Sequence, residues 1–175
     1  VDCTPEQIIV GSGTEQLMPL LIRILGTDAT YAIEDPGYPL THHVFYHNNR
    51  EAIPILVDDE GMDVRALQRS GATIAYVTPS HQFPTGTVLS ASRRIALLNW
   101  ASSKKEHFII EDDYDSEFRY SGRPIPSLQG MDKSGNVIYL STFSKSLMPS
   151  LRIAYMVLPP VLLDRYEKAF IHYAA

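Results

Sequence analysis

Short apolar runs alternate with amphipathic stretches along this chain, and this alternation limits the fold more than any other feature of the sequence. Apolar residues recur at helical spacing in 14–25 and 90–104, whereas 73–78 and 107–111 have the short apolar pattern of buried strands. Strands that alternate with helices favour an α/β fold in which a mostly parallel sheet lies between two layers of helices. In such a three-layer α/β/α fold, ligand sites form just beyond the carboxyl ends of the strands.

The remaining segments fit the same arrangement. Further strands are expected over 30–33, 52–57, 136–140 and 152–158, and further helices over 40–48, 62–69 and the last part of the chain. Gly26 is expected to end the first helix, and Ser90 is a candidate N-cap for the helix over 90–104.

Composition limits the function of this segment. The 175 residues suit one domain, and a formal net charge of −5 gives the segment no bulk electrostatic reason to bind DNA or an anionic membrane. One cysteine, Cys3, excludes an internal disulfide and fits the cytoplasm. The apolar runs are too short to cross a membrane. The histidines have no metal-binding spacing, so no metal is expected.

The two ends read as cuts from a longer polypeptide. The chain begins at Val1 with neither an initiator methionine nor a secretory signal, and helix-like sequence continues up to Ala175.

A glycine-rich segment, Gly11–Glu15, opens the first expected helix. Glycine lets the backbone approach a ligand closely, and the N–H groups at a helix start bind phosphate. The other reading is a simple loop in which Ser12 or Thr14 caps the helix.

Acidic residues follow the strand over 107–111. In Glu111-Asp112-Asp113-Tyr114, a carboxylate could hold a metal, accept phosphate or pair with a cationic ring nitrogen, or the segment could be a solvated acidic loop. Adjacent aspartates also occur in receiver domains of response regulators. There, however, they lie near the N-terminus, whereas here they lie two-thirds along the chain.

Lysine and arginine follow the strand over 136–140. Lys145 lies among hydroxyl residues, including Ser144, and a lysine at such a position can capture an aldehyde once its amine loses a proton. Arg152 could clamp a phosphate through two hydrogen bonds. Tyr38, on the turn Asp-Pro-Gly-Tyr-Pro, could hold its ring against a flat cofactor. The alternatives are a surface lysine, a salt bridge and core packing.

Taken together and in order, these motifs are specific. The series GSGTEQL, EDPGYP, TPSHQFPTG, EDDYDSEFRY and STFSKSLMPSLRIAY resembles the large domain of fold-type-I enzymes that use pyridoxal 5'-phosphate (PLP). It most resembles the MocR-type branch of the GntR-family transcription regulators, which join a winged-helix DNA-binding domain to an aminotransferase-like domain. The resemblance runs from about Ile8 to about Tyr166.

The resemblance implies a role for each matching residue. Lys145 would hold PLP as an internal aldimine, Asp112 would pair with the pyridine nitrogen, Tyr114 would hydrogen-bond the ring hydroxyl, and Tyr38 would stack on the ring. The phosphate would be held by a set at the helix start and on the later loop: Gly13, Thr14, Glu15, Ser144 and Arg152.

The sequence also departs from the general aminotransferase pattern. Phe83 stands where an asparagine usually contacts the ring hydroxyl, and Tyr114 follows Asp112 by two residues rather than three. The small C-terminal domain and a DNA-binding domain are both missing from residues 1–175, which would be the PLP-binding large domain alone. Catalysis by this segment alone is therefore not expected.

Three functions follow from these patterns. The first is an effector-sensing domain that binds PLP and an amino acid or amine, forms a homodimer, and acts on DNA only through a separate domain. The second is a genuine class I/II aminotransferase, which transfers an amino group from an amino acid to a 2-oxo acid. The third, a receiver-like signalling domain, is disfavoured by the order of the motifs.

Overall fold

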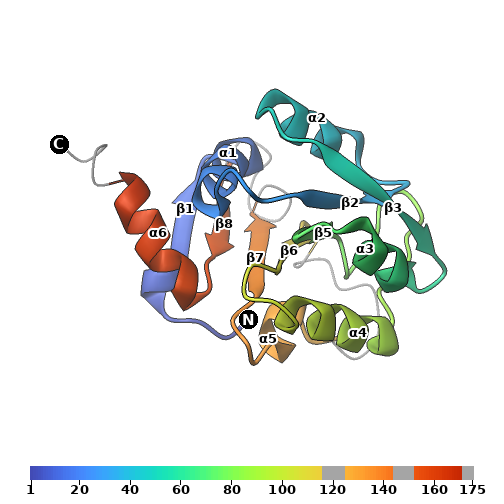
Figure 1. Ribbon diagram of the computed structural model, residues 1–175. Helices are drawn as coiled ribbons and strands as arrows, with labels where there is room; N and C mark the ends of the chain where they lie inside the picture. Colours follow the sequence, from blue (N-terminus) through green and yellow to red (C-terminus); the bar gives the residue numbers. More distant parts are fainter. Residues whose placement is uncertain (116–124, 144–151, 171–175) are drawn as a thin grey trace.

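The computed structural model of the chain describes residues 1–115, 125–143 and 152–170, and within them eight strands form one sheet (Figure 1). The strands are β1 (Ile8–Gly11), β2 (Tyr31–Asp35), β3 (Ala52–Asp58), β4 (Gly61–Met62), β5 (Ile74–Val77), β6 (Phe108–Asp113), β7 (Val137–Thr142) and β8 (Ala154–Val157). They lie in the order β1-β8-β7-β6-β5-β2-β3-β4.

The centre of the sheet is parallel. Neighbouring strands from β7 through β6, β5 and β2 to β3 all run the same way, whereas β8 pairs antiparallel with both β1 and β7, and β4 pairs antiparallel with β3. The predicted mostly parallel sheet is confirmed. Because two antiparallel pairings separate β1 from β7, these two strands also run in the same direction.

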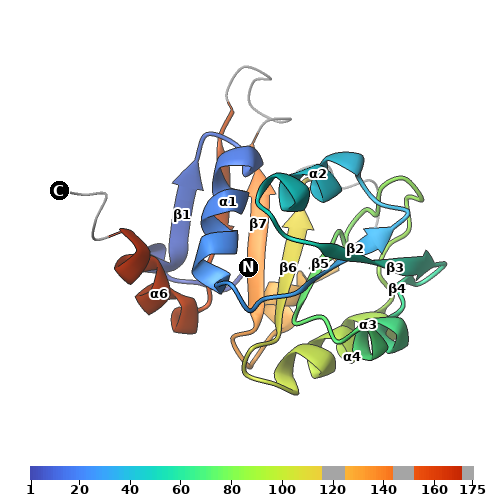
Figure 2. The same cartoon turned by 45° about the horizontal axis from the view of Figure 1, so that its top comes forward.

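Helices cover both faces of the sheet (Figure 2). They are α1 (Thr14–Leu25), α2 (Pro39–His47), α3 (Val64–Ser70), α4 (Ala91–Ser102), α5 (Leu128–Met131) and α6 (Pro160–Phe170), with a 3₁₀ turn η1 (Pro5–Gln7). Buried side chains of α1, α2 and α6 share one core, and those of α3, α4 and α5 share another on the opposite face. The predicted three layers are therefore present.

Alternation along the strands builds the two cores. In β5, Ile74 and Tyr76 point to the α1 side, whereas Ala75 and Val77 point to the α4 side. Such strands are buried on both faces, which explains why they read as continuous apolar runs in the sequence.

Most of the expected elements occur within two residues of their predicted bounds. The helix predicted over 14–25 runs from Thr14 to Leu25, and Ser90 caps α4 by accepting a hydrogen bond from the Arg93 N–H. The strands β1 and β4 were not predicted: β4 has only two residues, and β1 is an edge strand without a buried apolar run.

A buried arginine fixes the loop between β5 and α4. The Arg94 side chain is 1% exposed, and its guanidinium donates to three main-chain carbonyl oxygens: Leu89 at 2.9 Å, Pro126 at 3.0 Å and Pro79 at 2.9 Å. These bonds tie α4 to the loop that follows β5 and to the segment that precedes α5. The loop carries Gln82 and Phe83 toward the carboxyl end of the sheet.

We expect Arg94→Met to lower the free energy of unfolding by about 3 kcal/mol, because it removes three hydrogen bonds from a buried guanidinium and leaves the Leu89 carbonyl oxygen without that donor. Urea unfolding of the cofactor-free protein measures the change. Arg65→Met, at an exposed position on α3, is the control and is expected to change stability by less than about 0.5 kcal/mol. Equal effects of the two substitutions would show that the Arg94 contacts do not stabilise the loop.

Candidate functional site

The carboxyl end of the sheet gathers most of the residues that the sequence singled out. Strands β1, β2, β5 and β6 all end at this edge, so the start of α1, the turn after β2 and the acidic end of β6 meet there. Strand β8 runs in the opposite direction, so it begins at this edge. Arg152, two residues before β8, is thereby brought to the same place.

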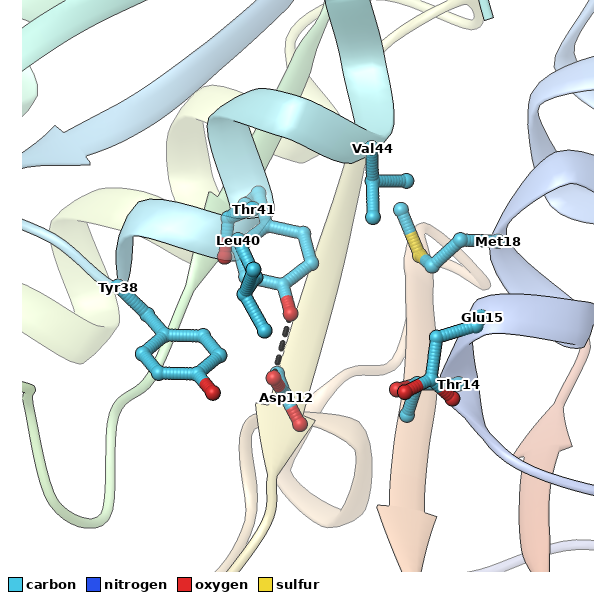
Figure 3. Close-up of a pocket in the computed structure, with 9 residues that line it drawn as sticks. Thr14, Glu15, Met18, Tyr38, Leu40, Thr41, Val44 and Asp112 are labelled. Carbon is cyan, nitrogen blue, oxygen red and sulfur yellow. Dashed lines mark hydrogen bonds between the residues drawn. The ribbon is translucent and has the colours of Figure 1, made fainter. Parts of the chain in front are cut away.

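A pocket of about 150 Å³ opens at this edge (Figure 3). Its lining comes from α1, β5, β6, α2 and the turn before α2, and consists of Thr14, Glu15, Met18, Tyr38, Leu40, Thr41, Val44, Tyr76 and Asp112. Four of these, Thr14, Glu15, Tyr38 and Asp112, are site residues predicted from the sequence. In Figure 3, Tyr38 lies on one side of Asp112, and Thr14 and Glu15 lie on the other.

The two carboxylate oxygens of Asp112 differ in their hydrogen bonding. The Tyr76 hydroxyl donates to Oδ2, whereas Oδ1 is buried and has no hydrogen-bond partner among the described residues. Burial raises the pKa of Asp112 to about 6; the Tyr76 hydrogen bond opposes this rise, and the charge of Asp113 adds to it. A buried carboxylate with an unpaired oxygen is costly, and it suits a site that receives a cationic hydrogen-bond donor.

The two neighbouring acids serve the fold. Glu111 is fully buried and accepts hydrogen bonds from the N–H groups of Leu128 and Gln129, at 2.8 and 2.9 Å, at the start of α5. Burial raises its pKa to about 7. Asp113 accepts from the Tyr139 hydroxyl at 2.8 Å. The reading of this segment as a solvated acidic loop is therefore wrong for Glu111 and Asp113.

The start of α1 lies beside Arg152. Gly13 has φ 138°, and a Cβ there would lie 2.6 Å from Glu15 Oε2 and 3.4 Å from Arg152 Nη2, so only glycine fits. Arg152 Nη2 lies 2.8 Å from Glu15 Oε1, in an exposed ion pair. The pKa of Glu15 is lowered first by its own main-chain N–H and then by Arg152. A carboxylate of the chain itself thus lies at the helix start, where anions bind.

The turn that carries Tyr38 is held by hydrogen bonds from the loop that follows β5. Glu34, buried at the end of β2, accepts hydrogen bonds from the Thr78 hydroxyl at 2.6 Å and the Thr78 N–H at 3.2 Å. Gln82 Nε2 donates to the carbonyl oxygens of Pro36, at 2.7 Å, and Phe83, at 2.6 Å. A Cβ on Gly37 would lie 2.3 Å from the Glu34 carbonyl oxygen, which explains the glycine before Tyr38.

Phe83 packs against Tyr38 at the pocket edge. Their ring centroids are 5.4 Å apart in an edge-to-face arrangement, and both side chains are about half exposed. The position where aminotransferases usually have an asparagine thus supports an aromatic ring instead of offering an amide.

Tyr114 does not line the pocket, in contrast to Asp112. Its hydroxyl donates to the His81 carbonyl oxygen at 2.7 Å, and its ring stacks on the His81 ring. The His81 Nδ1 in turn lies 2.8 Å from Asp115 Oδ2. Ser144 and Lys145 lie outside the described residues.

The sequence reading missed Tyr76 and Thr41. Tyr76 belongs to an apolar strand pattern, and Thr41 to an expected helix, so neither stood out as polar site residues. No cluster of three or more possible metal ligands exists in the described part of the chain, and none of the helices described there is long and apolar enough to span a membrane.

Comparison with known proteins places the chain in a family. The model of the family aminotransferase class I and II matches residues 1–173. The uncharacterized HTH-type transcriptional regulator YdeL of Bacillus subtilis is 50% identical over 165 residues, which cover 94% of this chain and 35% of that protein. The probable rhizopine catabolism regulatory protein MocR of Rhizobium meliloti is 39% identical over 169 residues, which cover 96% and 34%.

A solved structure agrees with the fold. The kynurenine aminotransferase of Pyrococcus horikoshii, in complex with PMP, superposes with a TM-score of 0.82 at 34% identity, over 93% of this chain and 42% of that one. This chain spans about a third of the length of the curated regulators that it matches. The chain is similar over nearly its whole length to about a third of the sequence of the HTH-type and MocR regulators, and it belongs to the class I and II aminotransferase family.

Proposed function

We propose that the chain is a PLP-binding, effector-sensing domain in which Lys145 holds the cofactor covalently. One arrangement carries the proposal: the unpaired oxygen of Asp112 and the anion-binding start of α1 belong to the same pocket. PLP has a cationic ring nitrogen and a phosphate, which these two features suit.

Asp112 would pair with the ring nitrogen. Its Oδ1 is buried and lacks a partner among the described residues, and a protonated pyridine nitrogen supplies one donor and a positive charge. When bound, PLP would supply an electron sink and an aldehyde that amino compounds attack. The residues of the chain would bind and orient PLP and keep its ring nitrogen protonated.

The start of α1 and Arg152 would hold the phosphate. Gly13 leaves room there, the first N–H groups of the helix favour an anion, and Arg152 supplies a guanidinium. Thr14 and Glu15 would contribute main-chain N–H groups, and Ser144 a hydroxyl. The Glu15 carboxylate would first have to leave Arg152.

Two tyrosines would contact the ring. Tyr38 lines the pocket beside Asp112, a position that suits stacking. Tyr114 would hydrogen-bond the ring hydroxyl after leaving the His81 carbonyl. Burial raises the pKa of Tyr114 to about 12, and the charges of Asp115, Asp112 and Glu34 add to the rise, so its hydroxyl stays protonated and can donate.

Sensing is favoured over turnover because the curated relatives at 50% and 39% identity are regulators. The full-length protein would bind an amino acid or amine, form a homodimer and reach DNA through a separate domain. The likeness to an archaeal aminotransferase supports the alternative, a genuine transaminase. Promoter binding and amino-donor turnover by the full-length gene product distinguish them. Turnover at about 1–1000 s⁻¹ with no promoter binding would overturn the sensing proposal.

Lys145→Ala is expected to abolish the pyridoxyl group that borohydride fixes on the full-length protein, because the side-chain amine is lost. Visible absorbance during a PLP titration and peptide mass mapping after reduction make the measurement. Lys133→Ala, at an exposed position, is the control and should label like the wild type. A pyridoxyl group found on another lysine of the wild-type protein would contradict the assignment.

Asp112→Asn is expected to weaken PLP binding and, without the cofactor, to stabilise the protein by about 2 kcal/mol at pH 7. The raised pKa means that the folded wild-type protein holds this proton more tightly than the unfolded chain does. Wild-type stability relative to the variant is therefore lost as pH rises from about 4 through about 6. Urea unfolding across this range makes the measurement. A stability difference that does not change with pH would contradict the origin given for it.

Glu15→Gln is expected to tighten PLP binding about threefold at low salt, because the phosphate no longer competes with a carboxylate for Arg152. Pyridoxal, which lacks the phosphate, should bind both proteins equally. Glu51→Gln, at an exposed position on the loop before β3, is the control. Equal PLP affinity of the wild type and the Glu15 variant would exclude this competition.

A further inference from the structure

Tyr76 lies against the one carboxylate that the proposed function assigns to the ring nitrogen. It is on β5, which pairs in parallel with β6 so that Tyr76 is opposite Ile110. Asp112 follows Ile110 by two residues, so its side chain projects from the same face of the sheet as that of Tyr76. The Tyr76 hydroxyl can thus reach along the strands and donate to Asp112 Oδ2.

Helix α2 holds the Tyr76 side chain from above. Thr41 lines the same pocket as Tyr76, and its side chain acts to lower the pKa of the Tyr76 hydroxyl. Phe45, one helical turn later, packs edge-on against the Tyr76 ring with centroids 6.2 Å apart. Tyr76 is only 8% exposed. Its ring is therefore held by Phe45 of this helix, and its hydroxyl by Asp112.

The direction of the hydrogen bond is fixed by chemistry. Burial first, and then the charge of Asp112, raise the pKa of Tyr76 well above its ordinary value, so the phenol keeps its proton and acts as the donor. Asp112 must then accept through Oδ2. This leaves Oδ1, which has no partner among the described residues, as the oxygen able to accept from a ligand.

We propose that Tyr76 is a positioning residue that holds Asp112 as a carboxylate and directs its second oxygen toward the ring nitrogen of PLP. This inference rests on the proposed function. Without the phenol, Asp112 takes the proton more readily, so the proton shared with the ring nitrogen moves toward the carboxylate. The ring then becomes a weaker electron sink.

The protein offers a matched pair of substitutions. Tyr76→Phe removes a buried hydroxyl that bonds Asp112, and Tyr31→Phe removes a buried hydroxyl that has no hydrogen-bond partner among the described residues. Both tyrosines belong to the same core and both pack against Phe45. An effect confined to Tyr76→Phe therefore reports the hydrogen bond rather than the loss of a hydroxyl from this core.

The test uses PLP labelled with ¹⁵N in the ring, bound to the full-length protein at constant pH. Tyr76→Phe is expected to shift the ¹⁵N resonance toward the value of an unprotonated pyridine and to weaken PLP binding about tenfold, the usual worth of a hydrogen bond to a charged group. Tyr31→Phe is expected to leave both unchanged. Thr41→Val, which leaves the buried ring in place, is expected to shift the resonance the same way by less.

The outcomes separate this inference from the proposed function. If the wild-type protein binds no PLP and gives no reducible adduct, the proposed function is wrong and the role of Tyr76 falls with it. If the wild type binds PLP on Lys145 but both Tyr76→Phe and Thr41→Val leave the ¹⁵N resonance where it was, only the role of Tyr76 is overturned. Should Tyr76→Phe fail to fold, the Thr41→Val spectrum alone decides in the same way.

Discussion

The pairing of β6 between β5 and β7 is the constraint on which the site depends. Both edges of β6 are occupied by parallel neighbours, so the register of the strand is fixed from two sides. A shift by one residue would exchange the faces of Asp112 and Asp113, placing the wrong carboxylate beside Tyr76. The same pairing buries Asp112, so neighbouring hydrogen-bond donors strongly affect the pKa of its carboxyl group.

Stability and function are in tension at this edge of the sheet. Asp112 keeps a buried oxygen unpaired among the described residues, and the charges of Glu34 and Asp112 disfavour each other. Compensation lies elsewhere, in two apolar cores and in the buried guanidinium of Arg94, which holds the loop between β5 and α4. The fold thus tolerates an unfavourable group where a ligand would relieve it.

Sequence patterns predicted the local secondary structure and the site residues that belong to recognisable motifs. The amphipathic pattern of α1 and the apolar strands of the centre followed from periodicity, and Asp112, Thr14, Glu15 and Tyr38 followed from motifs that meet in one pocket. Contacts between distant segments were not predictable, because no spacing along the chain encodes the approach of Tyr76 to Asp112. Nor did any pattern reveal that Glu15 would turn its carboxylate toward Arg152.

Helix α2 has two faces with different surroundings. Its inner face carries Thr41 and Phe45, and its first residue follows Tyr38, whereas Tyr46 and His47 are exposed on its outer side. Rotation of this nine-residue helix about its axis would move the aromatic ring at the pocket and the support of Tyr76 together.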